Sequence, residues 1–338
     1  MKRAENNQGV APGGSVVTHE AHAYIQLNTT CNQKCLFCNR PPMDPTKVVK
    51  WCIPKSKDVM KAIKDKLRDP AMKRIIFTGG EPLLYPDISK VIRFAKKCGF
   101  MVEIQTNGTL LDRQMISTLK DAGLDIINFG LHSHKKNVSS QLRGVRFGFE
   151  TIIKNLRLAD KNGFKIHIIH VINSFNYKDL PGFIDFMHKL RLHNLWLNLS
   201  LVVPEGWAWE NKRVIPRARD IKPFLQKAMK KCSTYGIRFD VSEIVPLCIV
   251  DGFENHAIST LFKISQFKIV DDYLSGVRGL DFSKPSSLQA AKAPQCKKCT
   301  MNAICAGFYP RLKELYGVRD FIPRTDDPLP VYKKLRLI

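Results

Sequence analysis

The sequence lacks any apolar run long enough to cross a bilayer, and its first residues lack the apolar segment of a secretory signal. These absences predict a protein with no membrane span that works in the reducing cytoplasm. In that compartment ten cysteines favour metal binding or catalysis over disulfide bonds. The sequence also lacks a zinc-finger or RNA-recognition signature.

Acidic residues are few relative to basic ones, with 30 Asp and Glu against 54 Lys and Arg, which gives a net charge of +24. The simpler interpretation is a well-solvated surface. The alternative is a polyanionic partner such as RNA, a nucleotide or an acidic peptide. Because no nucleic-acid-binding motif accompanies the charge, the first interpretation is preferred and nucleic acid stays a possible partner.

Apolar stretches alternate along the chain with amphipathic, helix-like stretches. Such alternation predicts an α/β fold with parallel strands and crossover helices, here a partial (β/α)6 TIM-like barrel. Functional residues of such a barrel gather where its strands end. The expected strands are 22–28, 74–80, 100–108, 124–133, 164–173 and 194–206, and the expected helices are 58–69, 87–99, 110–123, 147–163, 178–190 and one near 218–235.

A chain of 338 residues is longer than one small core needs, which predicts one large domain with an appendage. The alternating pattern changes near residue 236, and cysteines then recur. We therefore expect a flexible leader over 1–18, the partial barrel over 19–235 and a small cysteine-rich module over 236–338.

Three cysteines, Cys31, Cys35 and Cys38, follow the first expected strand within eight residues. Thiolates at this spacing bind zinc or an iron–sulfur cluster. Three thiolates can hold three corners of a four-iron cube and leave the fourth iron open, as a catalytic site requires. The alternative is a zinc site whose fourth ligand is His19, His22 or Cys52.

A second motif, TGGEP at Thr78 to Pro82, follows the second expected strand. Together with the Cys31, Cys35 and Cys38 spacing, it resembles the signature of the radical S-adenosylmethionine (radical SAM) superfamily over about residues 20–205. The resemblance implies a [4Fe–4S] cluster whose open iron binds the amino and carboxylate groups of S-adenosylmethionine. It also implies an electron donor such as flavodoxin or ferredoxin, and a 5′-deoxyadenosyl radical that removes a hydrogen atom from the substrate.

The resemblance assigns further residues to S-adenosylmethionine. Gly79 and Gly80 would let the backbone approach its amino group, Glu81 would face the ammonium end, and Pro82 would stiffen the turn. Phe37 would lie against adenine, and Asn173, at the end of the fifth strand, matches a ribose-contacting position. Alternatively, Phe37 is a core aromatic residue and Asn173 a turn residue.

One position departs from the family pattern. Many relatives have a serine at the end of the fourth strand, where this chain has Gly130 in GLHS. Ser133 or a neighbour would then contact the ribose, or the ribose would be held differently. His132 and His134 lie at the same strand end and could contact substrate or donate protons, although a solvent-exposed loop histidine is the more common finding.

A second cysteine group comprises Cys296, Cys299 and Cys305, with Cys248 upstream. Four thiolates also suit a structural zinc ion. Their spacing resembles the SPASM or twitch extensions of radical SAM enzymes, which implies one auxiliary [4Fe–4S] cluster. A cluster with four thiolate ligands has no open iron, so its expected role is to accept an electron from a substrate radical.

The substrate is not specified by the sequence. The resemblance implies oxidation or bond formation on a peptide or protein side chain or a small molecule, and alternatively a reaction on a nucleotide or RNA. The C-terminal cysteine spacing disfavours a GTP cyclase. Trp207, Trp209, Glu205 and Glu210 follow the sixth strand and are candidate substrate contacts, or else packing residues. The remaining alternative is a non-catalytic iron–sulfur or zinc protein that binds nucleic acid.

Overall fold

The structure is a computed structural model that describes residues 21–40, 53–146, 148–265, 269–272 and 290–338. The leader expected over 1–18 lies outside these residues, as do His19 and Cys52. No helix among the described residues is long and apolar enough to cross a membrane.

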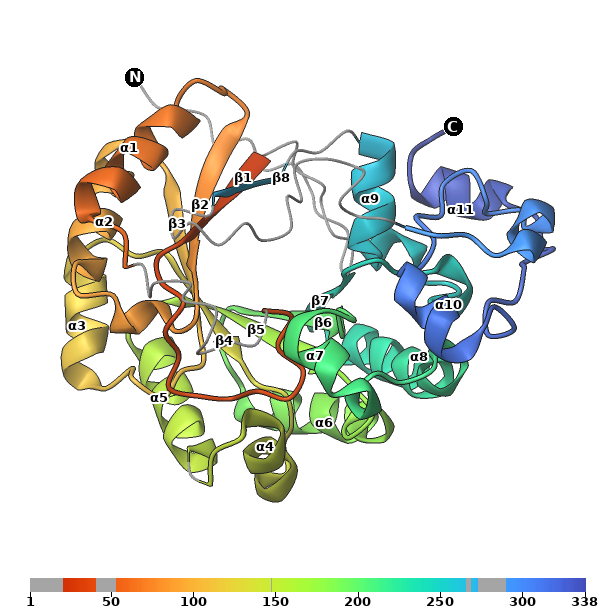
Figure 1. Ribbon diagram of the computed structural model, residues 1–338, viewed down its shortest axis with the longest axis horizontal. Coiled ribbons are helices and arrows are strands. Elements are labelled where there is room, and N and C mark those ends of the chain that lie inside the picture. Colours follow the sequence, from red (N-terminus) through yellow and green to blue (C-terminus); the bar gives the residue numbers. More distant parts are fainter. Residues whose placement is uncertain (1–20, 41–52, 147, 266–268, 273–289) are drawn as a thin grey trace.

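A single curved sheet of parallel strands forms the centre of the fold (Figure 1). The strand order is β7-β6-β5-β4-β3-β2-β1-β8, and each strand pairs in parallel with its neighbours. The strands are β1 (Ala21–Gln26), β2 (Met72–Thr78), β3 (Met101–Thr106), β4 (Ile126–Gly130), β5 (Lys165–Ile172), β6 (Leu195–Leu201), β7 (Arg238–Ser242) and β8 (Ile269–Asp272).

Helices cover the outer face of the sheet, as expected for right-handed crossovers between parallel strands (Figure 1). The α-helices are α1 (Ser56–Lys66), α2 (Ile88–Lys97), α3 (Arg113–Asp121), α4 (Lys136–Arg143), α5 (Phe149–Lys161), α6 (Leu180–Leu190), α7 (Gly206–Glu210), α8 (Ala218–Thr234), α9 (Ile258–Ser265), α10 (Pro310–Tyr316) and α11 (Leu329–Lys334). The 3₁₀ helices are η1 (Pro82–Leu84), η2 (Tyr177–Asp179), η3 (Lys212–Val214), η4 (Leu247–Ile249), η5 (Glu254–His256) and η6 (Pro294–Lys298).

The predicted partial TIM-like barrel is confirmed, and the sheet is larger than the six strands expected. β7 pairs in parallel with β6, so the sheet continues past the expected boundary at residue 235. The segment before β7 is the long helix α8, and the strand–helix alternation therefore runs for one more repeat. β8 pairs with β1, as the last strand of a closed eight-stranded barrel does. β7 and β8, however, are at opposite edges of the sheet and do not pair with each other. The barrel is consequently open on one side.

Strand residues alternate between an apolar outer face and a more polar inner face. Outward residues such as Ile166 and Ile168 of β5 are fully buried under the helices. On the inner face, the Glu103 carboxylate is contacted by Arg74 Nη1 at 3.3 Å, Asn128 Nδ2 at 2.8 Å and His167 Nδ1 at 3.6 Å. Burial alone would raise the pKa of Glu103, but these partners offset it and hold the pKa at about 2. These contacts link four neighbouring strands, β2, β3, β4 and β5, on the inner face of the sheet.

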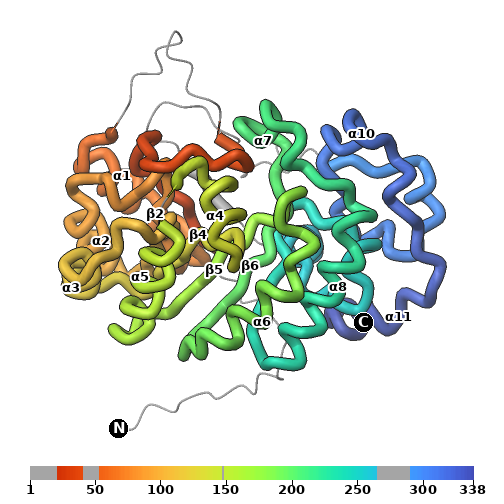
Figure 2. The backbone as a smooth tube through the Cα atoms, turned by 90° about the horizontal axis from the view of Figure 1, so that it is seen from below, coloured from red at the N-terminus to blue at the C-terminus, as the bar shows by residue number. Residues whose placement is uncertain are grey.

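Residues 290–338 pack against the α8 side of the barrel (Figures 1 and 2). The Phe308 and Phe321 rings stack with centroids 3.6 Å apart, and Phe321 is in the same buried core as the barrel residues. Asp320 accepts two hydrogen bonds from Arg217, at the start of α8, at 3.1 and 2.8 Å. These contacts fix the C-terminal segment beside the ends of β6 and β7.

Candidate functional site

The loop that carries Cys31, Cys35 and Cys38 follows β1 and is fixed by backbone hydrogen bonds to two helices. Lys34 N and Leu36 N donate to the carbonyls of Arg143 and Leu142 at the end of α4, at 3.1 and 2.9 Å. On the other side, α7 donates from Trp207 N and Ala208 N to the carbonyls of Arg40 and Cys38, both at 3.0 Å. Figure 2 shows this loop between α4 and α7. The cysteines are therefore held at the carboxyl ends of the strands.

Gly206 makes the contact with α7 possible. Its φ is +53°, and a Cβ at this position would lie 2.0 Å from the carbonyl oxygen of Arg40. Gly144 has the same role on the α4 side, where a Cβ would lie 2.6 Å from the carbonyl oxygen of Lys34. Both contacts require glycine because any side chain would displace the cysteine loop.

The TGGEP turn lies directly against the start of the cysteine loop. Gly80 N donates to Asn28 O at 3.0 Å, and Glu81 N donates to Thr30 O at 2.7 Å. A Cβ on Gly80 would lie 2.1 Å from the Thr30 carbonyl oxygen, and one on Gly79 would lie 2.7 Å from the Asn28 carbonyl oxygen. Gly79 and Gly80 therefore let the TGGEP turn lie close against the cysteine loop.

The side chain of Glu81 is completely buried and points into the protein. Its Oε1 accepts from Leu83 N and from Thr106 Oγ1, and its Oε2 accepts from Asn107 N. Burial raises the pKa of Glu81, and these donors favour the ionised form. Both oxygens thus join the TGGEP turn to the end of β3, and a contact between this carboxylate and a bound ammonium group stays a prediction. Pro82, the first residue of η1, is also buried.

Arg143 is a functional candidate that sequence reasoning missed. Its side chain is 2 % exposed, its Nε donates to Gln33 Oε1 at 3.0 Å, and Nη2 has no hydrogen-bond partner among the described residues. Burial lowers the pKa of Arg143, and its charge interacts with Cys35, Cys31 and Glu81. A buried guanidinium with an unpaired donor is costly unless an anion completes it. Nothing in the sequence separates this arginine from the many other basic residues.

Phe37 and His132 pack together between the cysteine loop and β4, with ring centroids 4.4 Å apart. Val171 N donates to Nδ1 of His132 at 3.1 Å, and burial lowers the pKa of His132 well below its usual value. A neutral ring whose Nδ1 accepts must carry its proton on Nε2. A Cβ at Gly130 would lie 3.0 Å from this Nε2. The imidazole thus occupies the space above Gly130.

Ser133 and Asn173 are both buried and engaged in local turns. The Ser133 Oγ accepts from Lys135 N at 3.0 Å. Asn173 Oδ1 accepts from Phe175 N at 3.0 Å, and its Nδ2 donates to Val171 O at 3.0 Å. The structure therefore places both residues at the predicted strand ends and gives each of them a turn contact.

The three thiols lie on one short loop and have the chemistry of ligands to a metal centre. Partial burial raises the pKa of Cys31, and burial raises that of Cys35. Bound metal would supply the positive charge that the thiolates need. The described residues contain no group of three His, Cys, Asp or Glu side chains close enough for one metal ion. In a cube of four irons, each thiolate binds a different iron. His22, a candidate zinc ligand, lies at the opposite end of β1.

The four C-terminal cysteines come together, although Cys248 is remote from the others in sequence. Cys248, Cys296, Cys299 and Cys305 all line one pocket with apolar walls that include Met301 and Phe308. Leu247 N and Gly307 N donate to the Cys305 sulfur at 3.5 and 3.3 Å, and Arg324 N donates to the Cys299 sulfur at 3.4 Å. Burial raises the pKa of Cys248 to about 12. Four thiols in one pocket have the chemistry of ligands to an iron–sulfur cluster or to a zinc ion.

The residues after β6 pack against the C-terminal segment. The Trp209 ring lies between Lys212 Nζ and the Arg311 guanidinium, each 4.6 Å from its centroid, whereas Trp207 is 41 % exposed. Burial raises the pKa of Glu205, which is near Arg311. Trp209 is therefore a packing residue between the barrel and α10.

Glu243, just after β7, is another residue that sequence reasoning missed. Its φ of +74° is unusual for a residue with a side chain, and its Oε2 accepts from Tyr309 Oη at 2.8 Å. Burial raises the pKa of Glu243, which has no ion-pair partner among the described residues. A half-buried carboxylate on a strained backbone thus joins the end of β7 to Tyr309, four residues after Cys305.

Comparisons with known proteins agree with this geometry. The Radical SAM superfamily model matches residues 25–187, from β1 through most of α6. Fe-coproporphyrin III synthase of Methanosarcina barkeri is 28% identical over 166 residues, which cover 49% of this chain and 40% of that protein. A probable GTP 3′,8-cyclase of Metallosphaera sedula is 30% identical over 175 residues, 51% of this chain and 53% of that protein. The chain thus spans about half or less of these two relatives.

A solved structure shares the fold over a larger part of the chain. SuiB of Streptococcus suis, bound to its precursor peptide SuiA, superposes with a TM-score of 0.63. The alignment covers 90% of this chain and 75% of SuiB at 13% identity, which shows a common fold. Together with the cysteine loop and the TGGEP turn, these matches show that residues 25–187 carry the domain of the radical SAM superfamily of enzymes.

Proposed function

We propose that this protein reductively cleaves S-adenosylmethionine and abstracts a hydrogen atom from its substrate. When bound, a [4Fe–4S] cluster and S-adenosylmethionine supply the 5′-deoxyadenosyl radical for this step. The single observation that carries the proposal is the convergence of the cysteine loop, the TGGEP turn and the end of α4, joined by backbone hydrogen bonds. Cys31, Cys35 and Cys38 would hold the cluster.

The surrounding residues would hold S-adenosylmethionine. Arg143 offers an unpaired, buried N–H to its carboxylate, because a guanidinium pairs strongly with that group. Phe37 would lie against the adenine, and the Nε2–H of His132 would take the place of the missing serine hydroxyl. Gly79, Gly80, Glu81 and Pro82 would shape the edge of the site, with Ser133 and Asn173 at the neighbouring strand ends.

The C-terminal pocket is proposed to hold one auxiliary [4Fe–4S] cluster in a SPASM- or twitch-like module. The support is that four thiols from two distant segments line one pocket. Such a cluster would accept the electron left on a substrate radical, so the net reaction would be an oxidation or bond formation. The module would comprise the C-terminal cysteine segments, although β7 from the same range completes the barrel sheet.

A peptide or small molecule is the proposed substrate class. The fold is shared with SuiB, which was solved with a peptide bound, and one relative is named as a coproporphyrin synthase. A nucleotide or RNA is the second candidate, which the net charge of +24 and the similarity to a probable GTP cyclase favour. The match of residues 25–187 to a superfamily of enzymes argues against a non-catalytic nucleic-acid-binding protein. A cytoplasmic location stays a prediction.

Anaerobic reconstitution with iron and sulfide tests the proposal. We expect about eight irons per chain, two four-iron clusters by ligand count, and release of 5′-deoxyadenosine from S-adenosylmethionine with dithionite. Cys98→Ala is the matched control, because Cys98 lies at the end of α2 and belongs to neither cysteine group. Zinc in place of iron, or no cleavage, would contradict the proposal.

A further inference from the structure

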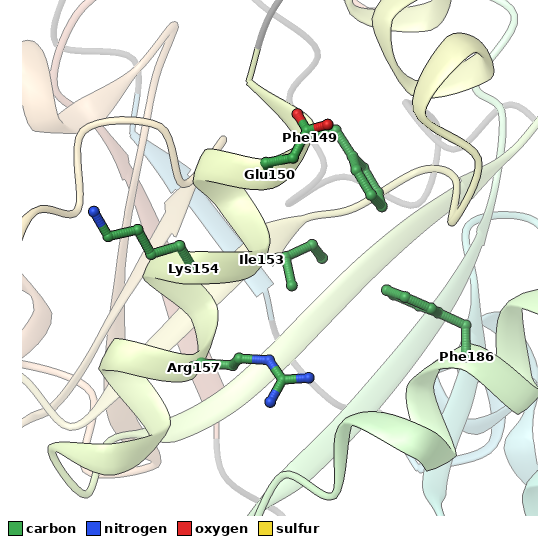
Figure 3. Close-up of a pocket in the computed structure, with 6 residues that line it drawn as sticks. All are labelled: Phe149, Glu150, Ile153, Lys154, Arg157 and Phe186. Carbon is green, nitrogen blue, oxygen red and sulfur yellow. The ribbon is translucent and has the colours of Figure 1, made fainter.

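A groove on the outer surface of the barrel, between α5 and α6, is not explained by the proposed function. Phe149, Ile153 and Phe186 form its apolar floor, and Glu150, Lys154 and Arg157 form its rim (Figure 3). The Phe149 and Phe186 rings, from the two helices, lie with centroids 6.3 Å apart. Figure 3 shows Ile153 and Arg157 extending from α5 toward the same opening. Partly exposed aromatic residues on outer helices are typical of an interaction surface.

The upper end of the groove lies close to the cysteine loop. Gly148, the residue before Phe149, packs against Arg143, whose Nη2 would lie 3.6 Å from a Cβ at that position. Arg143 in turn hydrogen-bonds Gln33 within the loop, at 3.0 Å. The start of α5, at the upper end of the groove, is therefore linked to the cysteine loop through Gly148, Arg143 and Gln33.

Ring contacts give a second short route to the same loop. The Phe186 ring lies 6.0 Å from that of His134, and the Phe37 ring lies 4.4 Å from that of His132. His132 and His134 are two residues apart, so their Cα atoms are separated by at most about 7 Å. Phe37 directly precedes Cys38. The rate of electron transfer falls steeply with distance. The groove between α5 and α6 is therefore a suitable position for a reductant, which must come close to the cluster.

The rim of the groove is positive. Lys154 and Arg157 are exposed, lie one turn apart on α5 and form no ion pair with any residue that the structure describes. The single acidic rim residue, Glu150, is paired with Lys136 Nζ at 2.7 Å. An apolar floor with a cationic rim is complementary to an acidic protein that has an apolar patch. A nucleic acid would instead favour a more polar and uniformly positive surface.

We propose that this groove is the docking surface for a small acidic electron-carrier protein that reduces the cluster bound by Cys31, Cys35 and Cys38. The inference rests on the proposed function, because it requires a reducible cluster at that loop. One electron leaves the reduced centre of the carrier and one is gained by the cluster, with no bond formed and no proton moved. The interface would be small and steered by charge, as in other electron-transfer encounters.

Charge reversal on the rim tests this inference. We compare the double variant Lys154→Glu/Arg157→Glu with the control Lys227→Glu/Lys230→Glu. The control removes the same charge from two exposed lysines that are also three residues apart, on α8. The readout is release of 5′-deoxyadenosine, driven either by reduced flavodoxin at low ionic strength or by dithionite. Where flavodoxin reacts slowly, an acidic ferredoxin replaces it.

The groove variant should lose about tenfold in the flavodoxin-driven rate, and the loss should shrink as salt is added. Its dithionite-driven rate and iron content should match the unsubstituted protein, which shows that it is folded. The α8 control should retain both rates. Binding of flavodoxin, measured directly by surface plasmon resonance, should weaken only in the groove variant.

Four results would overturn the inference. The groove variant could keep its flavodoxin-driven rate, or both variants could lose it equally. A third contradicting result would be that neither flavodoxin nor ferredoxin drives cleavage in the unsubstituted protein, although dithionite does. The groove variant could lose binding of a single-stranded RNA while it keeps carrier-driven cleavage, which would mark an RNA surface. No cleavage with dithionite in the unsubstituted protein would instead contradict the proposed function, and with it this inference.

Discussion

The two cysteine groups differ in how the chain surrounds them. Cys31, Cys35 and Cys38 are on one short loop that α4, α7 and the TGGEP turn hold through its backbone. The C-terminal set combines Cys248 with three later cysteines in one apolar pocket, where backbone N–H groups donate to the sulfurs. Within the part of the chain that the structure describes, only the first set has beside it a buried cation with an unpaired donor, Arg143 Nη2. Under the proposed function, this difference would let the first site admit an anionic ligand and the second surround a metal centre.

The largest expected effect comes from removing one thiol at each site. Cys35→Ala should reduce cleavage of S-adenosylmethionine to the background rate, because only two thiolates remain for the cluster. Cys305→Ala should retain dithionite-driven cleavage and lose about half of the iron, four atoms of about eight. Chromatographic measurement of 5′-deoxyadenosine, with iron analysis, checks both. If Cys305→Ala abolished cleavage as completely as Cys35→Ala, the distinction between the sites would be wrong.

Removing the cation at the first site should weaken cofactor binding. Arg143→Met should reduce affinity for S-adenosylmethionine by about tenfold to a hundredfold, since a charged hydrogen bond contributes about 1.5 to 3 kcal/mol. Equilibrium dialysis of the reconstituted protein measures this. The control is Arg146→Met, three residues away and exposed, which should bind normally. Equal affinity in the two variants would remove the proposed role of Arg143.

Disturbing the loop support should affect one site and spare the other. Gly206→Ala brings a Cβ against the Arg40 carbonyl and should cost about 2 kcal/mol of stability, with iron lost from the first site. Gly163→Ala has the same left-handed strain, with φ of +83° and open space around it, and should cost only about 1 kcal/mol. Thermal unfolding and iron analysis compare them. Iron loss from the C-terminal pocket in Gly206→Ala would argue against independent supports.

The smallest effect is expected at the position that departs from the family pattern. His132→Phe keeps an aromatic ring against Phe37 but removes the Nε2–H donor, which should reduce S-adenosylmethionine affinity severalfold. His134→Phe, two residues on, is the control for a general change in the loop. Equilibrium dialysis distinguishes them, and an unchanged affinity in His132→Phe would leave the departure at Gly130 unexplained.

The sequence predicted the barrel because strand and helix periodicities differ clearly over β1 to β6. It did not place β7 in the sheet, because RFDVS is short and is followed closely by Cys248, which drew the interpretation toward a separate module. β8 was missed because four residues carry too little pattern, and its pairing with β1 depends on tertiary contact.

The site was predictable where spacing alone determines chemistry, as for the three-cysteine loop. It was not predictable where function depends on burial. Arg143 is one of 54 basic residues in sequence, and only the structure shows it buried with an unpaired donor. The structure likewise shows that Glu81 is bound by three protein donors. The same limit applies to Glu243, whose strained backbone leaves no mark in the sequence.

The most direct test of the open and closed sites uses electron paramagnetic resonance on two reduced variants. One lacks the C-terminal thiols, through Cys296→Ala and Cys299→Ala, and the other lacks the loop thiols, through Cys31→Ala, Cys35→Ala and Cys38→Ala. Addition of S-adenosylmethionine should change the spectrum of the first variant, whose cluster has an open iron, and leave that of the second unchanged. A shift in the second variant, or none in the first, would contradict the account.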